Sequence, residues 1–296
     1  MTDDPAHPDG ALPRLGLVSY LNARPIGYGL LHGRQSGRFQ VVEEAPSVLA
    51  DELARGELDF ALVPSVELAR GWLAGRRDAI VPGISISSPG SAESVLLFAR
   101  APLGALRRIA LDVSSRTSVA LLRLLLRRRL RPGAPDPQFL PAEPDLPAML
   151  ERCEGALLIG DRALFARQQH PELVGGLTIH DLGREWNAMT RLPFVFAVWA
   201  GPARENQTWI IEALQDSLEE GLERIPEIAR HHSGGDLPTE RILLRYLSTS
   251  IRYDLGRREI RGLETFYRLL SEEGLLEGPP PALVFHRGRT RPRAPR

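Results

Sequence analysis

The chain has 296 residues, of which 43% are hydrophobic and 25% are charged, so it can bury a large core and predicts two lobes rather than one small domain. Its 37 basic and 37 acidic residues cancel, which removes any global attraction to nucleic acid or to a membrane surface. All of the basic residues are arginine, and the absence of lysine excludes P-loop nucleotidases, pyridoxal enzymes and protein kinases.

The apolar pattern predicts strands that alternate with helices through the first two thirds of the chain. A helix over residues 47–55 is one example, because Ser47 can cap its first turn. Alternation of this kind is typical of an α/β protein with a largely parallel sheet. The predicted strands cover residues 14–20, 38–44, 58–63, 79–86, 93–99, 107–111, 137–140, 155–160, 177–182 and 194–200.

Polar residues gather where four of these strands end. The first strand runs into a corner that contains Asn22 and then into Pro25, which favours a helix start. Because strand ends in open α/β sheets border the ligand crevice, we expect one polar cleft that holds an anion with hydroxyls, amides and helix N-termini. The other three ends carry Pro64 and Ser65; Ser114, Ser115, Arg116, Thr117 and Ser118; and Gly160 and Asp161.

Two apolar segments, 93–99 and 193–200, bracket about a hundred residues. If both cross between lobes, the chain leaves one lobe, builds a second and returns, which places the cleft between lobes joined by two hinge strands. Past residue 203 the pattern predicts only helices, over 204–231, 237–250 and 257–273. The leucines of the helix after Ser115 are expected to lie in the core: Leu121, Leu122, Leu125 and Leu126.

Several site classes lack their motifs. The sequence contains no His-Glu-x-x-His, Cys-x-x-Cys or Gly-x-Ser-x-Gly, so we expect no metal site and no serine hydrolase elbow. The glycines between Gly27 and Gly33 have the wrong spacing for a dinucleotide fingerprint. The sequence shows no leader pattern and no apolar run of membrane-spanning length. Its one cysteine, Cys153, is expected to be a packing residue. We therefore expect a soluble cytoplasmic protein.

Six blocks together resemble the chorismate dehydratases of the futalosine route to menaquinone, over residues 14–275. Six blocks in the right order are specific, whereas any one alone is weak. The blocks are Ser-Tyr-Leu-Asn-Ala-Arg-Pro (19–25), Gly-Glu-Leu-Asp-Phe-Ala-Leu-Val-Pro-Ser-Val-Glu (56–67), Ser-Val-Leu-Leu-Phe (94–98), Ser-Ser-Arg-Thr-Ser (114–118), Leu-Leu-Ile-Gly-Asp (157–161) and Leu-Pro-Phe-Val-Phe-Ala-Val-Trp (192–199).

The resemblance implies the two-lobed fold of type II periplasmic binding proteins, with mixed sheets flanked by helices and a cleft between the lobes. It implies a lobe of residues 13–97 plus 197–277 and an inserted lobe of 98–196. The tails at 1–12 and 278–296 are expected to be flexible, the second because it is rich in proline and arginine. It also implies a lyase that eliminates water from chorismate to give 3-[(1-carboxyvinyl)oxy]benzoate, the first step of the pathway, with no metal or organic cofactor.

On this resemblance, Asn22 corresponds to the cleft asparagine that hydrogen-bonds the reacting region and orients it without titrating. Chorismate is a dicarboxylate, so we expect hydroxyl, helix N-terminal and cationic donors to bind it. For Asp161, a helix N-cap is favoured over a contact with substrate. The expected substrate-binding residues are Ser65, Ser94, Ser115, Arg116, Thr117, Gly160 and Asp161.

Some alternatives stay open at this point. The catalytic base could be a protein side chain or the enolpyruvyl carboxylate of the substrate. The protein could instead resemble the 1,4-dihydroxy-6-naphthoate synthase of the same pathway, although the corner around Asn22 fits the dehydratase better. A non-catalytic small-anion binding protein of the same fold is the third reading, and the oligomeric state cannot be read from the sequence.

Overall fold

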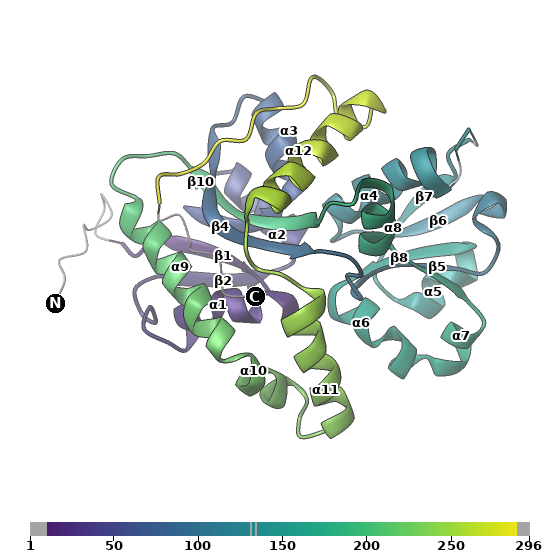
Figure 1. Ribbon diagram of the computed structural model, residues 1–296, viewed down its shortest axis with the longest axis horizontal. Coiled ribbons are helices and arrows are strands. Elements are labelled where there is room, and N and C mark those ends of the chain that lie inside the picture. The colour runs from purple at the N-terminus through teal and green to yellow at the C-terminus, as the bar shows by residue number, and fades with distance from the viewer. Residues whose placement is uncertain (1–10, 131, 134, 289–296) are drawn as a thin grey trace.

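The computed structural model describes residues 11–130, 132–133 and 135–288, and within them ten strands form two five-stranded sheets (Figure 1). Each predicted strand is confirmed, with ends that differ by a few residues. The first sheet has the order β2 (Gln40–Glu44), β1 (Arg14–Val18), β3 (Phe60–Pro64), β10 (Phe194–Pro202) and β4 (Asp78–Ser88). The second sheet has the order β7 (Gln138–Ala142), β6 (Arg108–Asp112), β8 (Gly155–Ile159), β5 (Val95–Ala99) and β9 (Thr178–Asp181).

Both sheets are mixed, and this corrects the largely parallel sheet that alternation suggests. In the first sheet β10 runs antiparallel to β3 and β4, while β1 is parallel to β2 and β3. In the second sheet β5 runs antiparallel to β8 and β9, while β6 is parallel to β7 and β8. The reversed strand in each sheet is the one by which the chain arrives from the other sheet.

The chain changes sheets between β4 and β5 and again before β10. The domain limits expected at residues 97 and 196 therefore fall inside strands that each belong to one sheet: β5 to the second, and β10 to the first. We call residues 95–190 the second lobe and the rest of the described chain the first lobe.

Helices cover both sheets, and those expected in the C-terminal third are present with short breaks. The helices of the first lobe are η1 (Leu21–Ala23), α1 (Arg24–Leu31), α2 (Pro46–Ala54), α3 (Ser65–Leu73), α9 (Thr208–Glu223), α10 (Ile225–His232), α11 (Leu237–Arg245), η4 (Tyr246–Ser250) and α12 (Arg257–Glu272). The helices of the second lobe are η2 (Leu103–Ala105), α4 (Arg116–Leu125), η3 (Leu126–Leu130), α5 (Leu146–Arg152), α6 (Gly160–Gln169), α7 (Pro171–Gly175) and α8 (Leu182–Thr190).

Asp181, at the N-cap of α8, holds the first crossover segment against the second lobe. Its carboxylate accepts hydrogen bonds from the Ser91 hydroxyl at 2.6 Å and from the backbone N–H groups of Ala92 and Glu93 at 3.0 and 2.8 Å. Asn187 on α8 joins the two crossovers, because its side chain donates to Pro89 O at 2.8 Å and to Leu192 O at 3.4 Å.

The C-terminal part of the described chain covers the open edge of β4. Ile80 N donates to Val284 O at 2.8 Å, and His286 N donates to Ile80 O at 2.9 Å. Further along the strand, Ser87 and Arg252 form an antiparallel bridge, in which each backbone N–H donates to the carbonyl of the other residue at 2.9 and 2.8 Å. An uncovered edge strand would expose unpaired backbone groups, and this pairing covers β4 with residues 284–286 of the tail that is expected to be flexible; residues 1–10 and 289–296 lie outside the described residues.

One large apolar core extends through both lobes. Trp186 from the second lobe packs edge-on against Phe194 and Phe266 of the first, with ring centroids 5.2 and 5.9 Å apart. Cys153 is 5% exposed and lies in a smaller apolar cluster of the second lobe, which confirms its packing role. The leucines expected in the core are buried there as predicted: Leu121, Leu122, Leu125 and Leu126.

Candidate active site

A pocket of about 550 Å³, including its open mouth, lies where the strand ends of the two lobes face each other. Six of the eight site residues expected from the sequence line it: Asn22, Ser94, Ser115, Arg116, Thr117 and Gly160. Its polar lining also includes three residues of the same polar segments that were not selected as site residues: Tyr20, Ser114 and Ser118. Its apolar walls are Val18, Pro46, Pro64, Ile86, Val95, Ile159, Phe196, Ala197 and Ile251.

Asn22 presents an unused acceptor to this pocket. Its Oδ1 atom is buried and has no hydrogen-bond partner among the described residues. The amide is held in place because it lies against the hydroxyl of Tyr246, which donates to Ser94 Oγ at 2.7 Å. Burial raises the pKa of Tyr246, so this phenol stays neutral and acts as a fixed support. A buried amide oxygen without a partner is suited to a hydroxyl or another donor on a bound ligand.

Ser115 provides a second unused polar atom at the start of α4. Its side chain is buried, makes no cap bond to the helix, and its Oγ has no partner among the described residues. The first N–H groups of an α-helix have no acceptor within the helix, and the helix dipole favours an anion there. This end of α4 can therefore bind a carboxylate between the serine hydroxyl and backbone N–H groups.

Tyr20 reaches across the pocket to the second lobe. Its hydroxyl hydrogen-bonds Ser114 Oγ at 2.9 Å, and Ser114 Oγ donates to Asp112 Oδ1 at 2.6 Å. Burial raises the pKa of the Tyr20 phenol and also that of the Asp112 carboxyl. The ring of Tyr20 rests on Gly160, where an added Cβ would lie 2.9 Å from Tyr20 Cδ2 and the backbone φ is +61°. Glycine is therefore required here by both space and conformation.

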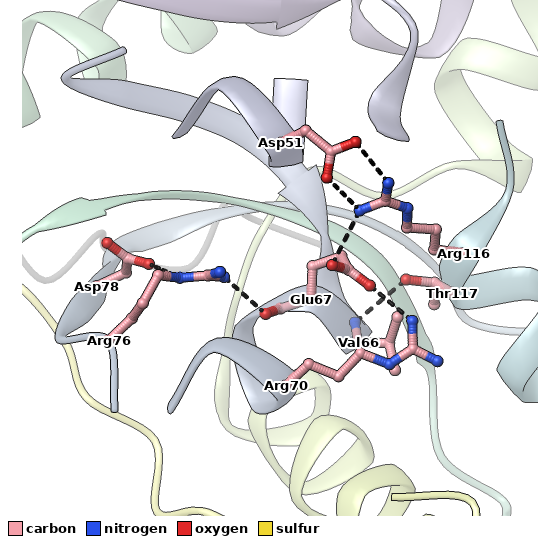
Figure 2. A network of polar contacts seen from close by, with 8 residues as sticks. All are labelled: Asp51, Val66, Glu67, Arg70, Arg76, Asp78, Arg116 and Thr117. Carbon is pink, nitrogen blue, oxygen red and sulfur yellow. Dashed lines mark hydrogen bonds and ion pairs between the residues drawn. The ribbon is translucent and has the colours of Figure 1, made fainter. Parts of the chain in front are cut away.

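Arg116 is not a free cation, although it lines the pocket. Its guanidinium donates to both carboxylate oxygens of Asp51, at 2.9 and 2.7 Å, and to Glu67 Oε2 at 3.1 Å (Figure 2). Glu67 also accepts from Arg70 at 2.7 Å. The Arg116 guanidinium lowers the pKa of Asp51 by this hydrogen bonding, so the pair stays charged and joins the two lobes.

Thr117 also joins the lobes. Its hydroxyl accepts a hydrogen bond from the backbone N–H of Val66 at the start of α3, at 3.2 Å (Figure 2). Both groups are buried, so losing this bond would leave a buried donor without an acceptor. The Thr117 side chain thus already has a structural partner, and Ser115 beside it is the residue with free capacity.

Two expected site residues lie outside the pocket lining. Ser65 is fully buried, and its hydroxyl donates to Val195 O at 2.8 Å, which fastens the start of α3 to β10. Asp161 turns toward the first lobe, where Oδ1 accepts from Leu21 N at 3.0 Å. Its own helix has Ile159 at the N-cap position, so Asp161 is not the cap of α6.

The described residues contain no group of three or more side chains suited to hold a metal ion. Across residues 11–130, 132–133 and 135–288, no helix combines the length and the apolar character that a membrane span needs. What the pocket offers is an apolar slot for a ring, an anion-binding helix end and one amide that can orient a polar substituent.

The two mixed sheets with a pocket between two lobes form a periplasmic-binding-protein-like fold. A chain from Archaeoglobus fulgidus superposes with a TM-score of 0.69 at 18% identity, covering 88% of this chain and 97% of that one. The periplasmic aliphatic sulphonate binding protein of Escherichia coli gives a TM-score of 0.61 at 17% identity, covering 90% and 94%. Both similarities concern the fold.

The sequence comparisons are more specific. Residues 13–272 match the family described as menaquinone biosynthesis, and the chain belongs to this family. A chorismate dehydratase of Thermus thermophilus is 35% identical over a 271-residue alignment, which covers 86% of this chain and 94% of that protein. The resemblance drawn from six sequence blocks is thereby confirmed.

Proposed function

We propose that this protein is a hydro-lyase that eliminates water from chorismate to give 3-[(1-carboxyvinyl)oxy]benzoate, without a metal or organic cofactor. The observation that carries the proposal is the 35% identity to a chorismate dehydratase over nearly the full length of both chains. The pocket supports it, since its apolar walls suit a six-membered ring and the start of α4 suits a carboxylate.

The chemistry requires little beyond positioning and proton transfer. A ring C–H bond and the neighbouring C–OH bond break, and the proton and the hydroxide leave as water. The new double bond completes an aromatic ring, which drives the reaction, and no electrons are gained or lost overall. Holding the reacting groups in the right geometry can supply up to roughly 7–11 kcal/mol of the barrier, so a rigid pocket suits this reaction.

We assign the role of base to the enolpyruvyl carboxylate of the substrate. Tyr20 and Arg116 are the residues of the lining with ionisable side chains. Burial raises the pKa of the Tyr20 phenol, and Arg116 is paired with two carboxylates, so neither is suited to accept a proton near neutral pH. Asn22 then orients the leaving hydroxyl through its unused amide oxygen, and Ser115 with the start of α4 holds a carboxylate.

The test is incubation of purified protein with chorismate. Loss of chorismate absorbance, together with an aromatic product lighter by one water in mass spectrometry, is the expected result. Chorismate that binds but is not converted would support a small-anion binding protein. If chorismate neither binds nor reacts, the result would favour a 1,4-dihydroxy-6-naphthoate synthase-like activity. We place the reaction in the cytoplasm, with which the single buried thiol of Cys153 is compatible.

A further inference from the structure

The short helix that carries Asn22 begins without a cap from its own segment. Helix η1 covers Leu21–Ala23, and its N-cap residue, Tyr20, makes no side-chain bond to it. Ala23 N bonds back to Tyr20 O at 3.0 Å, but the N–H groups that precede it in a helix have no intrahelical acceptor. Asn22 therefore sits on a turn that needs an acceptor from elsewhere.

Asp161 supplies this acceptor from the other lobe. Its carboxylate accepts a hydrogen bond from Leu21 N, which lies 3.0 Å from Oδ1 and 3.4 Å from Oδ2. The two residues are 140 positions apart in the sequence, and Asp161 belongs to the first turn of α6. Apolar packing fixes the contact, because Leu21 lies in one cluster with Leu164 and Phe165 of the same helix.

We propose that Asp161 is a positioning residue that caps η1 across the cleft and thereby sets the Asn22 amide in its working orientation. The inference rests on the proposed function, because it assigns to Asp161 a part in that reaction. It also explains why a residue outside the pocket occupies a family block, Leu-Leu-Ile-Gly-Asp, at the end of β8. Asp161 thus acts on the substrate through Asn22.

The charge state of Asp161 matters to the strength of this cap. Burial raises its pKa to about 6, against the opposing effects of Leu21 N and of Arg24. An ionised acceptor binds an N–H group more strongly than a neutral one, so protonation weakens the cap. The titratable and charged groups around Asp161 are Arg24 on α1, Tyr20 before η1 and Tyr246 on η4, with the ion pair of Glu93 and Arg245 beyond Tyr246.

A merely structural role would be to hold the lobes together, but other bonds already do this. Thr117 binds Val66 N, and Arg116 binds Asp51, both across the cleft. Removing the Asp161 carboxylate leaves these contacts in place while it frees the first turn of η1. The experiment must therefore separate loss of Asn22 orientation from general loosening.

The variants are Asp161→Ala, Asp161→Asn and a matched control, Asp145→Ala. Asp145 lies in the same lobe and accepts an N–H bond of equal length, 3.0 Å from Ala148 N, but it caps its own helix, α5. We expect Asp161→Ala to lower kcat roughly 10- to 100-fold, as for a misplaced catalytic group, with a much smaller change in KM. Asp161→Asn keeps an acceptor oxygen, so its kcat should be at least about fivefold higher than that of Asp161→Ala. Asp145→Ala should have the kcat and KM of the wild type.

Two further readouts complete the test. Wild-type kcat should fall as the pH drops through about 6, and Asp161→Asn should show no such fall. Combined with Asn22→Ala, Asp161→Ala should cause no additional loss, because its effect passes through Asn22. A full additional loss in that double variant, or equal kcat in all three single variants, would overturn the proposal.

A measurement that needs no turnover separates this proposal from the proposed function. Amide hydrogen exchange at Leu21, followed by NMR, should be faster in Asp161→Ala than in the wild type and in Asp145→Ala. Unchanged exchange at Leu21 would contradict the cap even in an active enzyme. Faster exchange in a protein that leaves chorismate unchanged would support the cap and refute the reaction instead.

Discussion

Replacing Asp161 by asparagine should change how folding stability depends on pH. Burial raises the pKa of this carboxyl from 3.8 to about 6 in the folded protein, and in the unfolded chain it returns to its ordinary value. A shift of about two pH units corresponds to about 3 kcal/mol in the free energy of unfolding at 25 °C. Asparagine has nearly the same shape and does not titrate.

Whether stability rises or falls with pH depends on which state, folded or unfolded, binds the proton of Asp161 more tightly. Because the folded pKa is raised, the folded protein holds this proton where the unfolded chain has lost it. The contribution to stability is therefore fully present below about pH 4 and is lost as the pH rises through about 6. The unfolding free energy of the wild type, minus that of Asp161→Asn, should fall by about 2 kcal/mol between pH 4 and pH 6 and by about 2.4 kcal/mol between pH 4 and pH 7.5.

Urea unfolding followed by tryptophan fluorescence, repeated from pH 4 to pH 7.5, measures this difference. Subtracting the variant removes the groups that titrate equally in both proteins, and equal m values would show that the unfolding transition is comparable. A difference that stays constant within about 0.5 kcal/mol would refute the reasoning. It would mean that the Asp161 carboxyl is solvated in the free protein and that the contact with Leu21 forms only after substrate binds.

Four other substitutions address the pocket itself. Asn22→Ala should leave the melting temperature nearly unchanged and abolish most turnover, and near-normal kcat would remove Asn22 from the reaction. Ser115→Ala should raise KM for chorismate, because it removes one hydrogen bond to a charged group, worth about 1.5–3 kcal/mol. Thr117→Val should instead lower the free energy of unfolding by about 1–3 kcal/mol, because it leaves a buried N–H unpaired. Thermal melts and kinetics on both variants test this pair, and a stability loss in Ser115→Ala with a KM change in Thr117→Val would contradict it. Gly160→Ala should cost about 1–2 kcal/mol for the left-handed backbone alone and should also displace the Tyr20 ring, so unchanged stability and activity would show that the ring does not rest there.

Local patterns in the sequence predicted the helices and strands, and they predicted most of the polar residues that line the candidate pocket. The strands could be placed because continuous apolar runs bounded by polar or glycine residues are a local signal. The polar corner around Asn22 and the serine run after β6 could be placed at the cleft because each follows a strand, and strand ends in α/β sheets border the ligand crevice. Burial of Leu121 and its neighbours followed from helical spacing in the same way.

The partner of each polar side chain, by contrast, depends on how distant segments pack together. Arg116 looks like an anion ligand in the sequence, but Asp51 and Glu67 from two other helices neutralise it. Ser65 turns away from the cleft to β10, and Asp161 caps a helix 140 residues earlier in the chain. Each of these bonds joins segments that are distant in the sequence, so no local pattern distinguishes a free donor from one that already has a partner.

The directions of the sheet strands were decided at the same level. Strands β5 and β10 have ordinary buried-strand patterns, and nothing in their residues indicates that they run against their neighbours. Their direction follows from the two passages of the chain between lobes, since each strand enters its sheet from the other lobe rather than from a helix packed on the same sheet. A run of apolar residues predicts that a strand is covered on both faces. It does not predict the direction of the strand, which depends on the path of the chain between the two lobes.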